Sequence, residues 1–201
     1  MNIGLYFGSF NPIHTGHLII ANYIANNTEL DEVWFVISPQ NPFKNTGSLL
    51  NEQHRLSLVK IAIDGEKKLK TSNVEFKLPK PSYTADTLIY LAEKYPTKKF
   101  SIIMGSDGYQ NIEKWKNYKY IINNYNIFIY QRPSFEIKNT LSKNIKIVDA
   151  PLLEISSTLI RKNIKDNKSI RYLVTDEVMK EIIAKNYYGN NLENPTEENT
   201  K

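Results

Sequence analysis

Two histidines stand three residues apart in the segment GSFNPIHTGH, which covers residues 8–17. They are His14 and His17, and the whole chain has three histidines. Side chains at positions i and i+3 of a helix project from one face. The first turn of a helix also attracts anions through its exposed N–H groups and its dipole. Two imidazole donors directed at one anionic centre would suit phosphoryl or nucleotidyl transfer, in which charge on the non-bridging oxygens must be held in place.

The residues around the histidines fit a turn from a strand into a helix. Gly8 follows an apolar run and lets the backbone approach a ligand closely. Pro12 stiffens the loop, and Thr15 or Gly16 begins the helix. A structural role for the histidines and a metal site of the His-x-x-His type are the alternatives. Neither the G-x-G-x-x-G fingerprint nor a P-loop is present.

A second segment, EISSTLIRKNI at residues 154–164, offers hydroxyls and a cation at the start of another helix. Ser156 is a plausible N-cap. Ser157 and Thr158 can present hydroxyls and N–H groups to a phosphate, and Arg161 lies on the same face as Ser157. A guanidinium at a helix N-terminus is a good clamp for a diphosphate. The alternative is an ordinary capped helix with a solvated arginine.

Apolar runs that end at glycine, proline or polar residues predict the strands, and helically spaced apolar residues predict the helices. Strands are expected at 2–7, 33–38, 74–78, 99–107, 125–133 and 145–151; helices are expected at 17–26, 52–63, from 84 to the stop at Pro96, 115–122, 156–163 and 175–187; 39–48 reads as a loop. The alternation predicts an α/β fold with a doubly wound parallel sheet and helices on both faces. Ligands bind such sheets beyond the carboxyl ends of the strands, where Gly8, Pro39, Gly105 and Arg132 fall.

Length and composition predict one domain over residues 1–188, whose last ~40 residues form a helical extension, and an apolar-poor tail over 189–201 that is expected to be mobile. The net charge is +5 and the isoelectric point is about 9.1. This surplus could serve nucleic acid or small anions, but it forms no dense basic cluster, so no nucleic-acid partner is expected. The chain lacks cysteine, basic residues before Lys44 and a long apolar stretch, so we expect a cytoplasmic protein with no membrane partner.

Both segments resemble signatures of the nucleotidylyltransferase superfamily. GSFNPIHTGH is similar to G-[ST]-F-x-P-x-H-x-G-H, and residues 155–161 are similar to ISSTxIR. The matched residues are Gly8, Phe10, Pro12, His14, Gly16 and His17 in the first segment and Ile155, Ser156, Ser157, Thr158, Ile160 and Arg161 in the second. The resemblance covers residues 1–188 and implies a Rossmann-like sheet and the transfer of AMP or CMP.

Three further stretches resemble the nicotinate mononucleotide adenylyltransferases of that superfamily. They are ISPQNPFK (37–44), PSYTADTL (81–88) and IIMGSDGYQNIEKW (102–115). The family transfers AMP from ATP to nicotinate mononucleotide, which gives deamido-NAD and pyrophosphate. In the family, the aspartate of the third stretch binds the adenylate ribose and its tryptophan stacks on the pyridine ring, which implies these roles for Asp107 and Trp115. The departures are GSD where GAD or GTD is commoner, and Lys116 where an aromatic residue is frequent.

The resemblance also implies a full set of site residues. ATP would contact Gly8, Ser9, Phe10, His14, Gly16, His17, Gly105, Asp107, Ile155, Ser157, Thr158 and Arg161, among which His14, His17 and Arg161 would be catalytic. Nicotinate mononucleotide would contact Asn11, Lys44, Thr84 and Trp115. Mg²⁺ would accompany ATP, with no metal ligands expected from the chain.

Several alternatives stay open at this point. A pantetheine-phosphate adenylyltransferase shares the first signature, and an adenylyltransferase that prefers the amide mononucleotide would share most of the motifs. A non-catalytic nucleotide sensor would keep the fold but lose the histidines or the arginine. A nucleic-acid-binding module is supported by the isoelectric point alone. A homodimer is common in the family and is left open here.

Overall fold

A six-stranded parallel sheet forms the centre of the molecule, in the order β3-β2-β1-β4-β5-β6. The computed structural model describes residues 1–40, 49–137, 140–151 and 153–189. Its strands are β1 (Asn2–Gly8), β2 (Glu32–Ile37), β3 (Leu69–Ser72), β4 (Lys99–Gly105), β5 (Asn126–Tyr130) and β6 (Ile145–Val148). The strand order reverses between β1 and β4, which makes the carboxyl ends of these two neighbours the topological switch point.

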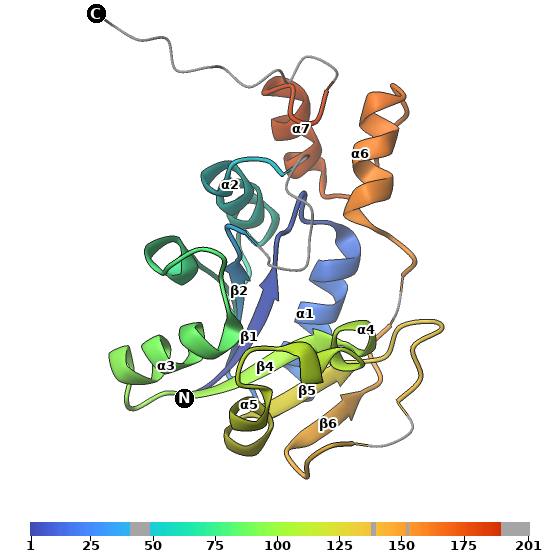
Figure 1. Ribbon diagram of the computed structural model, residues 1–201. Coiled ribbons are helices and arrows are strands. Elements are labelled where there is room, and N and C mark those ends of the chain that lie inside the picture. Colours follow the sequence, from blue (N-terminus) through green and yellow to red (C-terminus); the bar gives the residue numbers. More distant parts are fainter. Residues whose placement is uncertain (41–48, 138–139, 152, 190–201) are drawn as a thin grey trace, which may run out of the picture.

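Helices cover both faces of the sheet, as predicted (Figure 1). One apolar core lies between the sheet and the helices α1 (Thr15–Asn27), α2 (Glu52–Ala62), α6 (Ser157–Lys165) and α7 (Asp176–Ala184). The other lies between the sheet and the helices α3 (Thr84–Lys94), α4 (Ser106–Tyr109) and α5 (Tyr118–Asn124), with the 3₁₀ turns η1 (Val74–Lys77) and η2 (Ile112–Lys114). The central residues of β1, β4 and β5 are buried on both faces, which explains why period-2 alternation is absent from the sequence.

The predicted third strand is wrong by several residues. The segment expected to be a strand over 74–78 is the 3₁₀ turn η1, and the strand itself is Leu69–Ser72. This strand lies at the edge of the sheet and pairs with β2 alone, so its sequence LKTS needs no continuous apolar run. Val74 and Phe76, spaced like residues of a strand, instead point into the two cores from a tight turn.

The helical extension at the C-terminus returns to the carboxyl end of β1 (Figure 1). The N–H of Thr15 in α1 donates to the carbonyl of Leu173 at 2.9 Å, and the Thr15 hydroxyl donates to the carbonyl of Tyr172 at 3.0 Å. The segment before α7 is therefore fixed to the first turn of α1. The predicted tail, apart from Gly189, lies outside the described residues.

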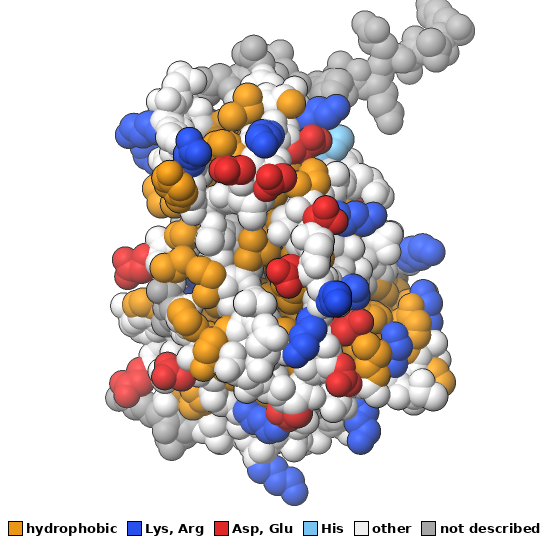
Figure 2. Space-filling model, turned by 180° about the vertical axis from the view of Figure 1, so that it is seen from behind, with side chains coloured by type: hydrophobic (Ala, Val, Ile, Leu, Met, Phe, Trp, Pro, Cys, Tyr) orange, Lys and Arg blue, Asp and Glu red, His pale blue; other side chains and the backbone are white. Residues whose placement is uncertain are grey.

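Two features of the structure concern membranes and nucleic acid, which are the partner classes that we do not expect from the sequence. Among the described residues, none of the helices combines the length and apolar character that a membrane span requires. On the face shown in Figure 2, basic and acidic side chains are interspersed.

Arg55 of α2 is a buried charge that joins the ends of two strands. Its side chain is 0% exposed and donates hydrogen bonds to backbone carbonyls in the loops that follow β1 and β2. The acceptors are the carbonyls of Leu50 (2.7 Å), Ser9 (2.5 Å), Ser38 (2.9 Å) and Pro39 (3.2 Å). A buried carbonyl without a donor costs about 1–3 kcal/mol. The guanidinium therefore holds the loops after β1 and β2 in place.

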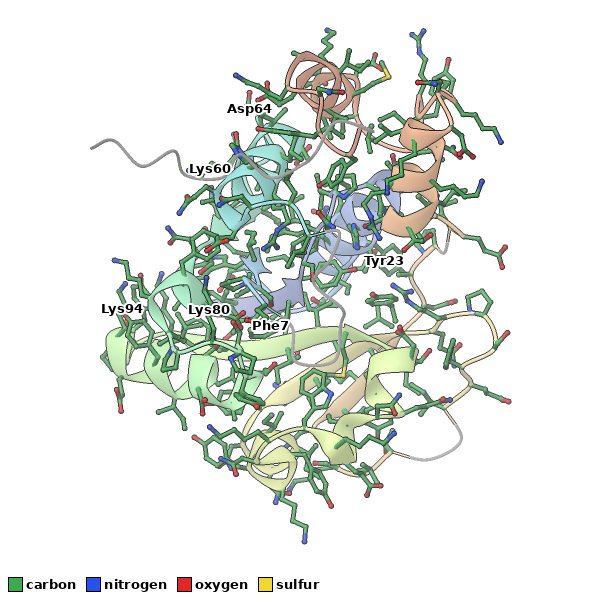
Figure 3. All side chains as sticks on the ribbon, turned by 45° about the horizontal axis from the view of Figure 1, so that its top comes forward. Phe7, Tyr23, Lys60, Asp64, Lys80 and Lys94 are labelled. Atoms are coloured by element: carbon green, nitrogen blue, oxygen red, sulfur yellow. The ribbon has the colours of Figure 1, made fainter. Side chains whose placement is uncertain are left out.

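We predict that Arg55→Met lowers the free energy of unfolding by about 3 kcal/mol, because several buried carbonyls lose their donor. Lys60→Met is the matched control, since Lys60 lies on the same helix with an exposed side chain (Figure 3). It should change the free energy by less than about 0.5 kcal/mol. Urea unfolding followed by circular dichroism measures both. Equal effects of the two substitutions would contradict this role for Arg55.

Candidate active site

The loop between β1 and α1 folds around the ring of Phe10. This residue has φ 45, in the left-handed region, and its ring is buried. The ring covers Gly8 so closely that a Cβ there would lie 2.7 Å from Phe10 Cζ. It also meets the His17 ring edge to face, with centroids 5.1 Å apart. Glycine at position 8 and an aromatic residue at position 10 are thus two parts of one packing arrangement that supports His17.

The two histidine rings stack on each other at the start of α1. Their centroids are 3.6 Å apart and their planes differ by 24°. His14 occupies the N-cap position with extended backbone, so its ring turns back over the first turn of the helix. A Cβ on Gly16 would lie 3.2 Å from His14 Nδ1. Glycine at position 16 therefore makes room for the His14 ring.

Burial makes His14 a weak base. Loss of solvent and, secondarily, the positive charge of Arg132 lower its pKa from 6.5 to about 4. His14 is consequently neutral near pH 7 when no anion is bound. A nearby negative charge would reverse this by stabilising the protonated ring.

The first turn of α6 is attached directly to the same loop. Ser157 Oγ donates to the carbonyl of Pro12 at 2.8 Å, and Arg161 Nη1 donates to the carbonyl of Asn11 at 2.7 Å. Arg161 Nη2 also reaches Thr158 Oγ1 at 3.3 Å. The predicted cap is confirmed, because Ser156 Oγ accepts from the N–H of Leu159. The first turn of α6 and the loop between β1 and α1, about 145 residues apart in sequence, are thus joined by hydrogen bonds.

A charged pair lies at the carboxyl ends of β4 and β5. Asp107 Oδ1 and Arg132 Nε are 3.3 Å apart, and both side chains are about two-fifths exposed. The N–H of Arg132 donates to Ser106 Oγ at 2.8 Å. A Cβ on Gly105 would lie 2.3 Å from Asp107 Oδ1. Glycine at position 105 therefore allows the aspartate to fold back toward the strand end.

Aromatic and polar residues lie around the N-terminus of α3. Thr84 begins this helix, as predicted, and Thr87 Oγ1 donates to the buried Glu75 at 2.9 Å. Burial raises the pKa of Glu75, opposed by the hydroxyls of Ser38, Thr87 and Ser82. Lys116, which replaces the aromatic residue frequent in the resembling family, pairs with Asp86 at 2.9 Å.

Both histidines, the first turn of α6, the Asp107–Arg132 pair and the start of α3 line one cavity of about 470 Å³ at the switch point of the sheet. The C-terminal end of β1, marked by Phe7 in Figure 3, opens into it. The predicted site residues among its lining are Gly8, Ser9, Phe10, Asn11, His14, His17, Thr84, Gly105, Asp107, Trp115, Ile155, Ser157, Thr158 and Arg161. Gly16 is not among the lining residues, and it leaves room for the His14 ring; its predicted contact with ATP stays a prediction. Lys44 lies outside the described residues.

Arg132 and Glu75 also line the cavity, although neither was among the predicted site residues. The signal for Arg132 was its place directly after a strand that ends at the ligand-binding edge of the sheet. Glu75 had no such signal, because the turn that carries it was expected to be a strand. The place of both residues at the cavity depends on how the loops fold over the end of the sheet.

Comparison with known proteins agrees with this arrangement. The model of the cytidylyltransferase-like family matches residues 5–163. The chain belongs to that family. A relative from Cytophaga hutchinsonii, named probable nicotinate-nucleotide adenylyltransferase, is 51% identical over 193 residues, which are 94% of this chain and 100% of the relative. A relative of the same name from Flavobacterium johnsoniae is 48% identical over 191 residues, 94% of this chain and 99% of the relative.

A solved structure gives the same result for the cytidylyltransferase-like fold. Nicotinic acid mononucleotide adenylyltransferase from Plasmodium falciparum, complexed with NaAD, superposes with a TM-score of 0.81 at 25% identity. The match covers 93% of this chain and 97% of that chain. The predicted Rossmann-like nucleotidylyltransferase fold is confirmed.

The depressed pKa of His14 predicts a loss of stability in acid. Between pH 6.5 and about 4, the unfolded chain protonates this histidine while the folded protein keeps it neutral, so protons favour unfolding. The 6.5-to-4 shift corresponds to about 3 kcal/mol. We predict that lowering the pH over this range reduces the free energy of unfolding of His14→Asn by about 3 kcal/mol less than that of the wild type. Urea unfolding of both proteins at each pH measures the difference. Parallel pH profiles of the two proteins would contradict the low pKa.

Proposed function

We propose that the protein transfers AMP from ATP to nicotinate mononucleotide, which gives deamido-NAD and pyrophosphate. The observation that carries this proposal is the shared cavity of the two signature segments. His14 and His17 face it from the start of α1, and Arg161 faces it from α6. The chain thereby brings imidazole, hydroxyl and guanidinium donors to one place, which is the requirement for holding a triphosphate.

The reaction depends on positioning the two substrates and stabilising the charge on the phosphates, more than on acid–base chemistry. The second pKa of a phosphate monoester is about 6, so the acceptor phosphate is largely dianionic at neutral pH. One of its oxygens attacks the α-phosphorus of ATP in line. The new bond between that oxygen and phosphorus forms as the bond from the α-phosphorus to the bridging oxygen breaks. The electron pair leaves with pyrophosphate, so no general base and no covalent enzyme intermediate is required.

Each group of donors has a place in this scheme. His14 and His17 hold oxygens of the α-phosphate, and the negative charge of the triphosphate shifts His14 toward its protonated, donating form. Ser157, Thr158 and Arg161 hold the β- and γ-phosphates. Asp107 binds the adenylate ribose. Arg132, which adds a further positive charge to the cavity, stands beside Asp107 and keeps its carboxylate in position.

The other end of the cavity suits the acceptor. The N–H groups at the start of α3, near Thr84, favour a carboxylate over a neutral amide. The flat face of Trp115 offers a surface for the pyridine ring. Asn11 supplies an amide to the acceptor phosphate, and we place Lys44, which lies outside the described residues, in the same role.

Magnesium fits this scheme as a companion of the nucleotide. Among the residues that the structure describes, no three histidine or acidic side chains are grouped to hold a metal ion. We propose that Mg²⁺ is bound through phosphate oxygens, where it neutralises charge on the pyrophosphate. The protein itself then contributes the imidazole, guanidinium and hydroxyl donors that line the cavity.

Several broader expectations are part of the same proposal. Residues 1–188 would act as one catalytic domain in the cytoplasm, without nucleic-acid or membrane partners. A homodimer is compatible with a site whose described residues all come from one chain.

The acceptor assay tests the proposed function. The purified protein is incubated with ATP, Mg²⁺ and one of three acceptors: nicotinate mononucleotide, its amide or phosphopantetheine. We predict release of pyrophosphate that is fastest with the acid, because the start of α3 favours a carboxylate. Faster release with phosphopantetheine, or no release with any acceptor, would refute the proposal.

A histidine substitution tests the role of the first signature. We predict that His17→Ala lowers kcat by ~10²–10³, the usual cost of removing one well-placed donor, with a near-normal far-ultraviolet circular dichroism spectrum. The matched control is His54→Ala, because His54 lies on α2 and bonds Tyr187 outside the cavity. Its kcat should stay within about twofold of the wild type. Near-normal turnover by His17→Ala would show that this imidazole holds no reacting phosphate.

A further inference from the structure

Two tyrosines follow α7 and return the chain to the catalytic loop. Tyr187 and Tyr188 are 7% and 4% exposed, and both rings belong to the core beneath α1 and α2. Tyr188 has φ 66, so the backbone reverses direction at this position. The two hydroxyls diverge. Tyr187 bonds Nδ1 of His54 on α2 at 2.8 Å, while Tyr188 enters the loop between β1 and α1.

The Tyr188 hydroxyl donates to Oδ1 of Asn11 at 2.9 Å, and this bond is buried. The same oxygen accepts the N–H of Leu50 at 3.1 Å. An amide oxygen has two acceptor positions, so both are used here. This pair of donors holds the Asn11 side chain in one orientation.

Asn11 is itself central to the cavity. It lines the cavity wall, and its backbone carbonyl accepts from Arg161. Asn11 is thus held by the segment before α2 and the segment after α7 through its side chain, and by α6 through its backbone. The free energy of binding depends on such preorganisation, because an amide that must first be ordered loses affinity for its ligand. Burial also raises the pKa of Tyr188 far above its usual value, so the hydroxyl keeps its proton and stays a donor.

We propose that Tyr188 is a positioning residue for the acceptor, which holds the Asn11 side chain in the cavity wall where the phosphate of nicotinate mononucleotide binds. The inference rests on the proposed function. It assigns to the segment after α7, which lies outside both signatures, a part in acceptor binding. Tyr187, in the same core and with its own hydrogen bond, has no such part.

Tyr188→Phe tests the inference, because it removes one oxygen and keeps the ring in the core. We expect KM for nicotinate mononucleotide to rise about tenfold, while KM for ATP and kcat stay within about twofold. Tyr187→Phe is the matched control and should leave all three constants within about twofold. Equal constants for Tyr188→Phe and the wild type, or an equal fall in kcat for both variants, would overturn the inference.

A double-mutant cycle shows whether Tyr188 acts through Asn11. In an Asn11→Ala background, Tyr188→Phe should change KM for the acceptor by less than about twofold, since the amide is already absent. A tenfold rise in that background would overturn the inference. Wild-type protein that makes no dinucleotide would refute the proposed function instead.

A nuclear magnetic resonance measurement reads the positioning without substrate. The side-chain amide signals of Asn11 are identified by their absence in Asn11→Ala. These signals should shift in Tyr188→Phe and stay in place in Tyr187→Phe. Unchanged Asn11 signals in Tyr188→Phe would overturn the inference even in an inactive protein.

Discussion

The rest of this structure depends on hydrogen bonds that side chains from distant segments donate to the backbone carbonyls of one loop. The loop between β1 and α1 contributes three such carbonyls, and each takes a side-chain donor from outside the loop. The pairs are Ser9 with Arg55, Asn11 with Arg161, and Pro12 with Ser157. Leaving any of these buried acceptors unpaired would cost about 1–3 kcal/mol. The loop therefore has one conformation, in which its carbonyls face the protein and the histidine rings face the cavity.

The electrostatic state of the cavity follows from the same packing. The rings of His14 and His17 are stacked, with centroids 3.6 Å apart. Burial and Arg132 keep His14 neutral, with a pKa of about 4. Positive charge at the cavity therefore comes from Lys116 and from the guanidinium groups of Arg132 and Arg161. In the proposed reaction, the guanidinium groups attract the triphosphate, and the triphosphate then makes the imidazole protonation favourable.

Local patterns in the sequence predicted most of the fold and the centre of the site. Continuous apolar strands gave the parallel sheet, and the two signatures gave His14, His17 and Arg161. What the patterns missed depends on contacts between distant residues. The edge strand β3 has no apolar run because it pairs on one side alone. Arg55 looks like an ordinary helix residue and Tyr188 like the last residue of the predicted domain, since their partners Ser9 and Asn11 lie 46 and 177 positions away. The room that Gly16 leaves for the His14 ring likewise shows only in the folded structure.

A crystal structure of the protein with a non-hydrolysable ATP analogue would show directly which residues hold the triphosphate. We predict one triphosphate at the switch point between β1 and β4. Imidazole nitrogens of His14 and His17 and the guanidinium of Arg161 should all lie within about 3.2 Å of its oxygens. A triphosphate bound elsewhere, or one that contacts the histidines while α6 and Arg161 lie apart from it, would contradict the claim that both ends of the chain hold the same ligand.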